Sequence, residues 1–268
     1  MPELAFVVPN AGADRAADLT TALSGEVSRQ DAASLLCAGF AEPRADRAYV
    51  VLGAAGETDA EPTASQLSRT IVILLAPPGS ERFASGAELA RRAGAAFHVN
   101  SVATERLLEI GVPARHLQLG YSPAWEAPNA AAAGDLTIAP VDELELLARA
   151  QLTTIGDSGG YFDWVRALRA IHSGAVVLHE HSVGSAPLVA GRHLFFAAPA
   201  AQDAIAAALL DDQQRLDRVR REALEFVRGA LPLALAAAAL IGTARTLVAQ
   251  PLPVAIAPTP GQPTSRSK

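Results

Sequence analysis

The stretch from Tyr161 to Ala198 constrains the fold of this chain more than any other. Its sequence reads as a helix, a strand, a loop and a second strand. Apolar residues recur at helical spacing as far as Gly174, a residue type that commonly ends helices. Residues Ala175–Leu178 are all apolar, as in a strand buried on both faces of a parallel sheet. A polar cluster, residues 179–184, then follows at the carboxyl end of this strand, where ligands of open α/β sheets bind.

Short apolar strands alternate with amphipathic helices along the rest of the chain too, which predicts an α/β protein with mostly parallel sheets. Strands are expected at residues 4–8, 49–52, 70–75, 96–99, 117–119, 135–140, 152–155, 175–178 and from 193 onwards. Helices are expected at residues 16–23, 31–36, 85–93, 102–110, 142–150, 161–173, 201–210, 213–228 and 231–248. Asp31 and Ser101 are the expected N-caps of two of these helices, and Cys37 is expected to be a small buried apolar residue on a helix.

Residues 123–134, rich in alanine and proline, predict a linker between two units. The first unit would comprise residues 1–122 and the second residues 135–250, followed by a Pro-, Ser- and Thr-rich tail at 251–268 that is expected to be disordered. We therefore expect two parallel-sheet domains that face each other across a cleft, the second of them shortened.

The charge and cysteine content narrow the possible partners and the compartment. A formal net charge of −6 argues against nucleic acid as the main partner. The single cysteine, Cys37, excludes an internal disulfide and fits a reducing cytoplasm. No signal peptide or integral membrane segment is expected, because the first residues lack a basic region and the apolar run at 230–241 is short and contains Pro232.

The glycine-rich run from Gly156 to Gly160 admits three interpretations. It matches the nucleophile motif of chymotrypsin-like proteases, but the β-barrels, disulfides and histidine element that accompany that motif are missing. Between a strand and a helix, such a loop exposes backbone N–H groups that attract phosphate. It is equally a tight turn in which Asp157 or Ser158 caps the helix.

Several histidines also have more than one interpretation. His179 and His181 would lie on one face of a strand, as a metal-binding pair can, but no spacing fixes His193 or His172 as a third ligand, and no metal is expected. Residues 180–182 could instead line a ligand pocket, or be ordinary polar residues at the end of a strand. Arg69, His98 and Asn100 are expected near strand ends that face the cleft. His98 is either a general base or a structural residue. The run 10–12 is either part of a ligand-binding loop of the first unit or a plain turn.

Two blocks of the sequence resemble glycosyltransferases of the two-domain GT-B class, in particular an actinobacterial-type branch of family 1-like enzymes. One block is the order of aromatic-rich helix, Gly, Ala-Val-Val, Glu-His-Ser and Pro-Leu-Val-x-Gly-x-His within residues 161–193. The other is QLSRTIVILLAPPG, followed by a helix, Gly-Val-Pro and His-Leu-Gln-Leu-Gly-Tyr, within residues 66–121. The resemblance implies two Rossmann-like domains, with the acceptor side in the first and the donor side in the second.

The resemblance also implies a function and a site. It implies sugar transfer from a nucleotide-sugar donor to an unknown acceptor, without a cofactor. His98 and Glu180 would be catalytic. The donor would be held by Ser158, Gly159, Gly160, Arg166, His181, Ser182 and Gly184.

Three departures from the family pattern leave two other classes of function open. Arg169 stands where many relatives have a glutamate that holds the ribose, and arginine accepts no hydrogen bonds. Asp157 stands where the branch tends to have a basic residue, and the segment between Pro140 and Leu152 has room for one helix only. The alternatives are a degenerate homologue, a pseudoenzyme kept as a binding or scaffold subunit, and a non-sugar nucleotide-binding regulator.

The last expected helix, residues 231–248, carries more large apolar residues than one stripe buries against a small domain. It is expected to cross back and pack on the first domain, as in the two-domain relatives. A helix that did not cross back would instead predict a homodimer or a protein partner.

Overall fold

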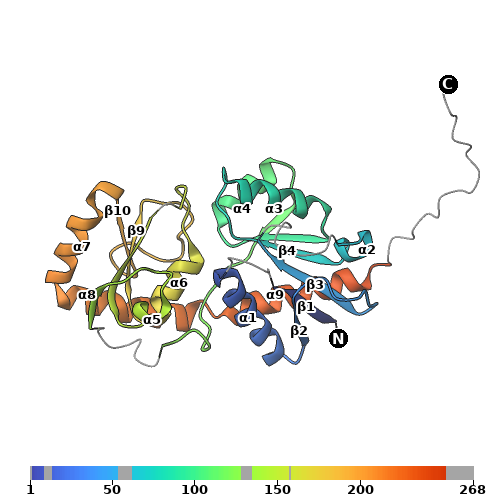
Figure 1. Cartoon of the computed structure of the whole chain (residues 1–268), viewed down its shortest axis with the longest axis horizontal. Coiled ribbons are helices and arrows are strands. Elements are labelled where there is room, and N and C mark those ends of the chain that lie inside the picture. The colour runs from blue at the N-terminus through green and yellow to red at the C-terminus, as the bar shows by residue number, and fades with distance from the viewer. Residues whose placement is uncertain (1, 9–13, 54–61, 128–134, 157, 252–268) are drawn as a thin grey trace, which may run out of the picture.

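The computed structural model describes residues 2–8, 14–53, 62–127, 135–156 and 158–251. Within these ranges the chain forms two parallel β-sheets, one of six strands and one of four. The two sheets and their helices make two units that lie side by side along the molecule (Figure 1). The predicted α/β fold with a smaller second sheet is therefore confirmed.

The first unit is built on the six-stranded sheet, whose order is β2-β1-β3-β4-β5-β6. Its strands are β1 (Glu3–Val7), β2 (Ala33–Cys37), β3 (Arg47–Leu52), β4 (Thr70–Leu74), β5 (Ala95–His98) and β6 (Ala114–His116). Its helices are α1 (Asp14–Arg29), α2 (Ala64–Leu67), α3 (Glu81–Arg92) and α4 (Ser101–Glu109). The central strands β3 and β4 are buried at every residue, which explains their continuous apolar sequence.

The second unit is built on the four-stranded sheet, whose order is β10-β9-β8-β7. Its strands are β7 (Leu136–Ile138), β8 (Ala150–Ile155), β9 (Val176–Glu180) and β10 (Phe195–Ala197). The helices that follow β7 are α5 (Leu144–Leu147), α6 (Trp164–Ser173), the 3₁₀ turn η2 (Pro199–Ala201), α7 (Gln202–Asp211), α8 (Gln213–Ala230) and α9 (Leu233–Ala249). Leu152, Val176 and Leu178 pack with α7 and α8 on one face of the sheet. Helix α6 packs on the other face, within the larger core.

The terminal helix α9 returns to the first unit, as expected. It packs against α1, β3 and β4 there, and Figure 1 shows this helix running in red beneath the first sheet. Its buried residues Leu240, Ile241 and Leu247 belong to a core cluster that also contains residues of both sheets. The apolar surface of the helix is therefore largely covered within one chain. None of the helices in the described part of the chain is long and apolar enough to cross a membrane.

Several expectations about the first unit are wrong in detail. Residues 31–36 form no helix, because α1 continues to Arg29, Asp31 adopts a left-handed backbone (φ 57°) and the next residues pair with β1 as strand β2. Cys37 therefore lies at the end of an edge strand and is partly exposed. A short apolar run is compatible with a strand or a helix, and residues 33–37 form a strand because they pair with β1. The N-cap of α4 is Asn100 and not Ser101.

Two further boundaries differ from the expected ones. Residues 117–119 follow the last strand of the first sheet and do not form a strand. The helix expected at 142–150 is the single turn α5, and Ala150 already belongs to β8. The predicted loop Asn10–Gly12, Asp157, residues 128–134 of the predicted linker and residues 252–268 of the predicted tail lie outside the described residues.

Helix α6 ends as the sequence predicts, and this end provides a test of the fold. Gly174 is its C-cap and has a left-handed backbone with φ 83°. Replacing it by alanine is expected to lower the free energy of unfolding by about 1 kcal/mol, because a side chain there is strained. Urea unfolding measures this loss. Gly229→Ala in α8, where no atom lies near the added Cβ, is the control and is not expected to destabilise the protein. Equal changes of the free energy of unfolding in the two variants would contradict the left-handed C-cap at Gly174.

Candidate functional site

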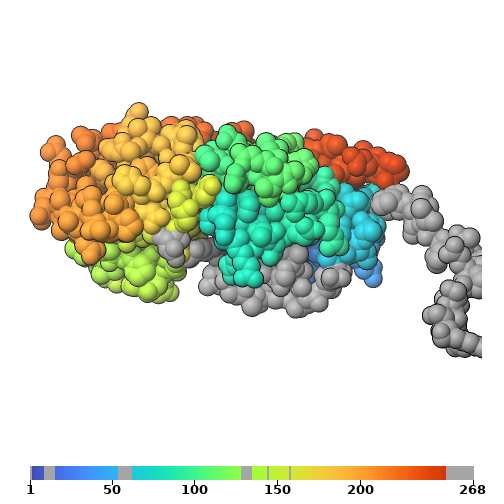
Figure 2. Space-filling model, turned by 90° about the horizontal axis from the view of Figure 1, so that it is seen from above, coloured from blue at the N-terminus to red at the C-terminus, as the bar shows by residue number. Residues whose placement is uncertain are grey.

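The carboxyl ends of the two sheets meet at the junction between the units. Gly159, which follows β8, lies against Pro77, which follows β4, with 3.6 Å between an added Cβ and the proline side chain. Gly184, which follows β9, packs on the side chain of Asn100, which follows β5. In the space-filling view of Figure 2, the yellow and gold surface of the second unit abuts the green surface around α4. The glycines of the predicted donor site therefore lie at this junction.

A pocket of about 450 Å³ opens at the carboxyl ends of β7 and β8. Its volume lies within the usual range for small-molecule sites. Its walls are residues 138–142 from the end of β7 onwards, residues 154–156 at the end of β8, and Arg166 from the first turn of α6. It therefore adjoins the predicted glycine-rich loop.

Arg166 supplies a positive charge to this pocket and is already paired. Its guanidinium lies 3.2 Å from Asp142 Oδ2 and 3.6 Å from Asp163 Oδ2. The Asp163 side chain also accepts a hydrogen bond from the Arg166 backbone N–H and caps α6. An anionic ligand in the pocket would compete with these two carboxylates for the guanidinium.

The glycine-rich loop is shaped by two residues with left-handed backbones. Gly159 and Gly160 have φ values of 62° and 79°, a conformation that favours glycine. Ser158 is buried, and its Oγ has no hydrogen-bond partner within the described residues. The carbonyl of Gly160 accepts a hydrogen bond from the N–H of Val183 at 2.9 Å. The structure thus brings this loop together with the segment that follows β9.

The polar cluster at the carboxyl end of β9 contains both buried and exposed side chains. His179 is fully buried, and its Nε2 accepts a hydrogen bond from the N–H of Asp163, so the proton lies on Nδ1 and is donated to the carbonyl of Glu180 at 2.8 Å. Burial lowers the pKa of His179. The Glu180 carboxylate lies beside Gly156 at the edge of the pocket. His181 is exposed and stacks on Phe196, and Ser182 Oγ lies 3.3 Å from His179 Nδ1.

His98 lies away from the pocket and is engaged on both ring nitrogens. Its Nδ1 accepts the backbone N–H of Asn100 at 2.9 Å, so Nε2 carries the proton and donates to the carbonyl of Ala76 at 3.0 Å. Burial lowers its pKa to about 4. A general base needs a free nitrogen within reach of the substrate. In this arrangement His98 has none, and it is not part of the site that we propose.

Arg169 is turned away from the pocket. It forms an ion pair with Asp18 of α1, in the first unit, and its side chain is 5% exposed. It therefore links the two units in this structure. Its position in the sequence alone gave no sign of this partner.

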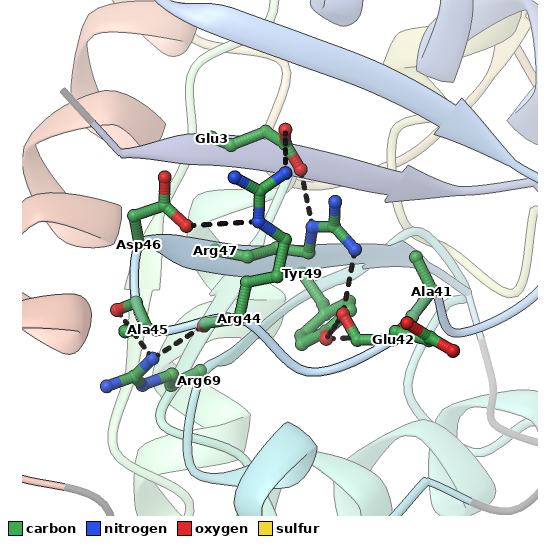
Figure 3. Close-up of polar contacts among 9 residues, drawn as sticks. All are labelled: Glu3, Ala41, Glu42, Arg44, Ala45, Asp46, Arg47, Tyr49 and Arg69. Carbon is green, nitrogen blue, oxygen red and sulfur yellow. Dashed lines mark hydrogen bonds and ion pairs between the residues drawn. The ribbon is translucent and has the colours of Figure 1, made fainter.

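The polar network in Figure 3 lies at the amino ends of the first sheet and does not belong to the candidate site. Arg47, at the start of β3, pairs with Glu3 at the start of β1. Arg69, just before β4, donates hydrogen bonds to the carbonyls of Arg44 and Ala45. The expectation that Arg69 faces the cleft is therefore wrong. Within the ranges the structure describes, no group of three or more His, Cys, Asp or Glu side chains is placed to hold a metal ion.

No family model matches the sequence of this chain. No curated protein shows a significant match to it either. Solved structures do resemble its fold. The Anabaena protein HepE in complex with UDP-glucose superposes with a TM-score of 0.58 at 12% identity, covering 91% of this chain and 99% of HepE.

Two further solved proteins have a similar fold. Sucrose-phosphate synthase from Thermosynechococcus elongatus gives a TM-score of 0.56 at 12% identity, covering 93% of this chain and all of the other. A glycosyltransferase from Rickettsia africae ESF-5 gives 0.50 at 9% identity, covering 92% and 98%. These likenesses establish similarity to the GT-B fold at low sequence identity. The particular branch within that class stays a prediction.

Proposed function

We propose that this chain is a nucleotide-sugar-dependent glycosyltransferase whose donor binds at the carboxyl ends of the second sheet. The observation that carries this proposal is the pocket of about 450 Å³ beside the glycine-rich loop, with Arg166 in its wall. The GT-B fold supports it, because HepE was solved with UDP-glucose. Ligands of open α/β sheets also bind at this end of the strands.

In this proposal the two sides of the site have different tasks. Backbone N–H groups of Ser158, Gly159 and Gly160, near the start of α6, would bind the diphosphate. Arg166 would offset its charge. Glu180, His181, Ser182 and Gly184 would line the side that carries the sugar, with Glu180 the candidate for contact with the transferred group. Catalysis would come from positioning the donor and stabilising the departing diphosphate. The acceptor stays open.

A second candidate function is a relative that binds a nucleotide-sugar without turnover and acts as a binding or scaffold subunit. Three contacts favour it. Arg166 already has two carboxylate neighbours, Arg169 is paired with Asp18, and His98 offers no free nitrogen. We place this candidate second because the chain has a pocket of suitable volume beside a loop with two left-handed glycines.

Calorimetric titration with UDP-, GDP- and TDP-sugars separates these functions. Binding followed by slow donor hydrolysis supports the transferase, and binding without hydrolysis supports the scaffold. Binding of nucleoside diphosphates irrespective of the sugar would favour a nucleotide-binding regulator. No binding of any of these ligands would refute the proposed donor site.

Replacing Arg166 by alanine is expected to weaken binding of the nucleoside diphosphate-sugar at least tenfold, because the pocket loses its cation while Asp142 and Asp163 remain. Arg149→Ala is the matched control. Arg149 pairs with Asp135 at the amino ends of β7 and β8, the opposite end of the same strands. It is expected to change the affinity less than twofold. Comparable losses in the two variants would mean that Arg166 acts only through the net charge of the protein.

A further inference from the structure

Asn100 uses its whole side chain at the junction between the two units. It is 1% exposed. Its Oδ1 accepts the N–H groups of Val102 and Ala103, at 3.0 and 3.2 Å, and caps α4 of the first unit. An asparagine or aspartate is a favoured N-cap for this reason.

The other half of the same amide group binds the second unit. Nδ2 donates to the carbonyl of Val183 at 3.0 Å and lies 3.3 Å from the carbonyl of Phe162. Phe162 follows the glycine-rich loop, and Val183 belongs to the segment that follows β9. One side chain therefore bonds both loops of the candidate donor site to the first unit.

The two loops also bond each other at this point. The Phe162 N–H donates to the carbonyl of Val183, and the Val183 N–H donates to the carbonyl of Gly160, each at 2.9 Å. Gly184 then packs on Asn100 so closely that an added Cβ would lie 2.5 Å from Asn100 Cγ. The indole N–H of Trp164 donates to the carbonyl of Gly184 at 2.9 Å. Asn100 therefore packs against two loops that are hydrogen-bonded to each other.

We propose that Asn100 is a positioning residue that keeps these two loops paired, and so couples donor binding in the second unit to the contact with the first unit. The coupling to donor binding rests on the proposed function, whereas the pairing of the loops does not. Without the amide donors, the buried carbonyl of Phe162 and the partly buried carbonyl of Val183 each lose a hydrogen-bond donor, which favours separation of the loops from α4.

Two substitutions separate this role from helix capping. Asn100→Asp keeps the capping oxygen but places a second acceptor opposite the carbonyls of Phe162 and Val183. Asn100→Ser keeps a capping hydroxyl and has no group long enough to replace Nδ2. Thr63→Ala is the control for loss of a cap alone, since Thr63 caps α2, which lies at the far side of the first unit in Figure 1.

The test is amide hydrogen exchange of the full-length chain, read at Phe162 and Val183. We expect at least tenfold faster exchange at both amides in Asn100→Asp and Asn100→Ser, and no change there in Thr63→Ala. Unchanged exchange in both Asn100 variants would overturn the proposal. If one Asn100 variant does not fold, the exchange rates of Phe162 and Val183 in the other variant decide the test.

Calorimetric titration with UDP, GDP and TDP tests the coupling. We expect at least a tenfold loss of affinity in Asn100→Asp for the nucleotide that the wild type binds. Faster exchange with unchanged affinity would overturn the coupling. If the wild type binds none of the three, the proposed donor site fails, and the exchange experiment still decides whether Asn100 pairs the loops.

Discussion

Replacing Gly120 by alanine is expected to lower the free energy of unfolding by ~3 kcal/mol or more. An added Cβ would lie 2.6 Å from the carbonyl carbon of Leu231 and closer still to its oxygen, both of them backbone atoms. The neighbouring residue Tyr121 donates its N–H to Leu231 at 2.6 Å and accepts the N–H of Leu233 at 2.8 Å. The methyl group would therefore force apart the two segments that connect the units and break both hydrogen bonds.

Urea unfolding of the variant measures this loss, and Gly242→Ala in α9 is the matched control. The same added methyl group at Gly242 meets no atom within 4 Å. Because alanine is the better helix former, this change is expected to stabilise the protein by about 0.5–1 kcal/mol. A lower free energy of unfolding in Gly120→Ala and a higher one in Gly242→Ala would support the close packing of Gly120 against Leu231. A Gly120→Ala protein of wild-type stability would contradict the pairing of Tyr121 with Leu231.

The parts of the fold that were predicted from the sequence carry strong local signals. Helix α6, its end at Gly174 and the strand that follows combine helical spacing, a C-cap glycine and a continuous apolar run, and all three point to one structure. The strand β2 was missed because Ala33–Cys37 is short and its mostly apolar sequence has no clear period, so that only its pairing with β1 decides its conformation.

For the candidate site too, the sequence predicts the features that have a local signal and misses the contacts between distant residues. The strand-end rule points to the loops that contain Gly159, Gly160 and Gly184, because these loops follow β8 and β9. The contacts of Asn100 escaped prediction, since its partners Phe162 and Val183 lie 62 and 83 residues away. The Arg169–Asp18 pair escaped for the same reason. The asparagine before α4 did carry one usable signal, its preference for the N-cap position.

The stability of this protein is expected to fall as the pH is lowered from 6.5 to 4, because two fully buried histidines must stay neutral in the folded chain. Burial lowers the pKa of His98 and of His172 from 6.5 to about 4. In this range the unfolded chain binds both protons and the folded chain binds neither, so each pH unit costs up to about 1.4 kcal/mol per histidine. Below pH 4 both states are protonated, and this contribution stops growing.

The geometry around each ring explains why protonation is resisted. His172 Nε2 accepts the N–H of Ser122 at 3.1 Å, and Nδ1 donates to the carbonyl of Leu168. A proton on Nε2 would break the bond to Ser122, which connects α6 to the segment between the units. Glu126 favours the charged ring, whereas Arg228 disfavours it, and burial outweighs both. His98 is bound in the same way between Ala76 and Asn100, and nearby His116 also disfavours its charge.

Urea unfolding between pH 7.5 and 5.0 measures the slope of stability against pH, and single glutamine substitutions assign it. His98→Gln and His172→Gln are each expected to reduce the slope by about 1 kcal/mol per pH unit, even where they lower stability at pH 7.5, because each removes one proton from the difference between the two states. In NMR titrations of the folded protein, the ring resonances lost in these two variants should not shift between pH 7 and pH 5. Rings that titrate near pH 6.5, or slopes equal to that of the wild type, would show that both histidines are solvated and that the junction between the units is open in solution.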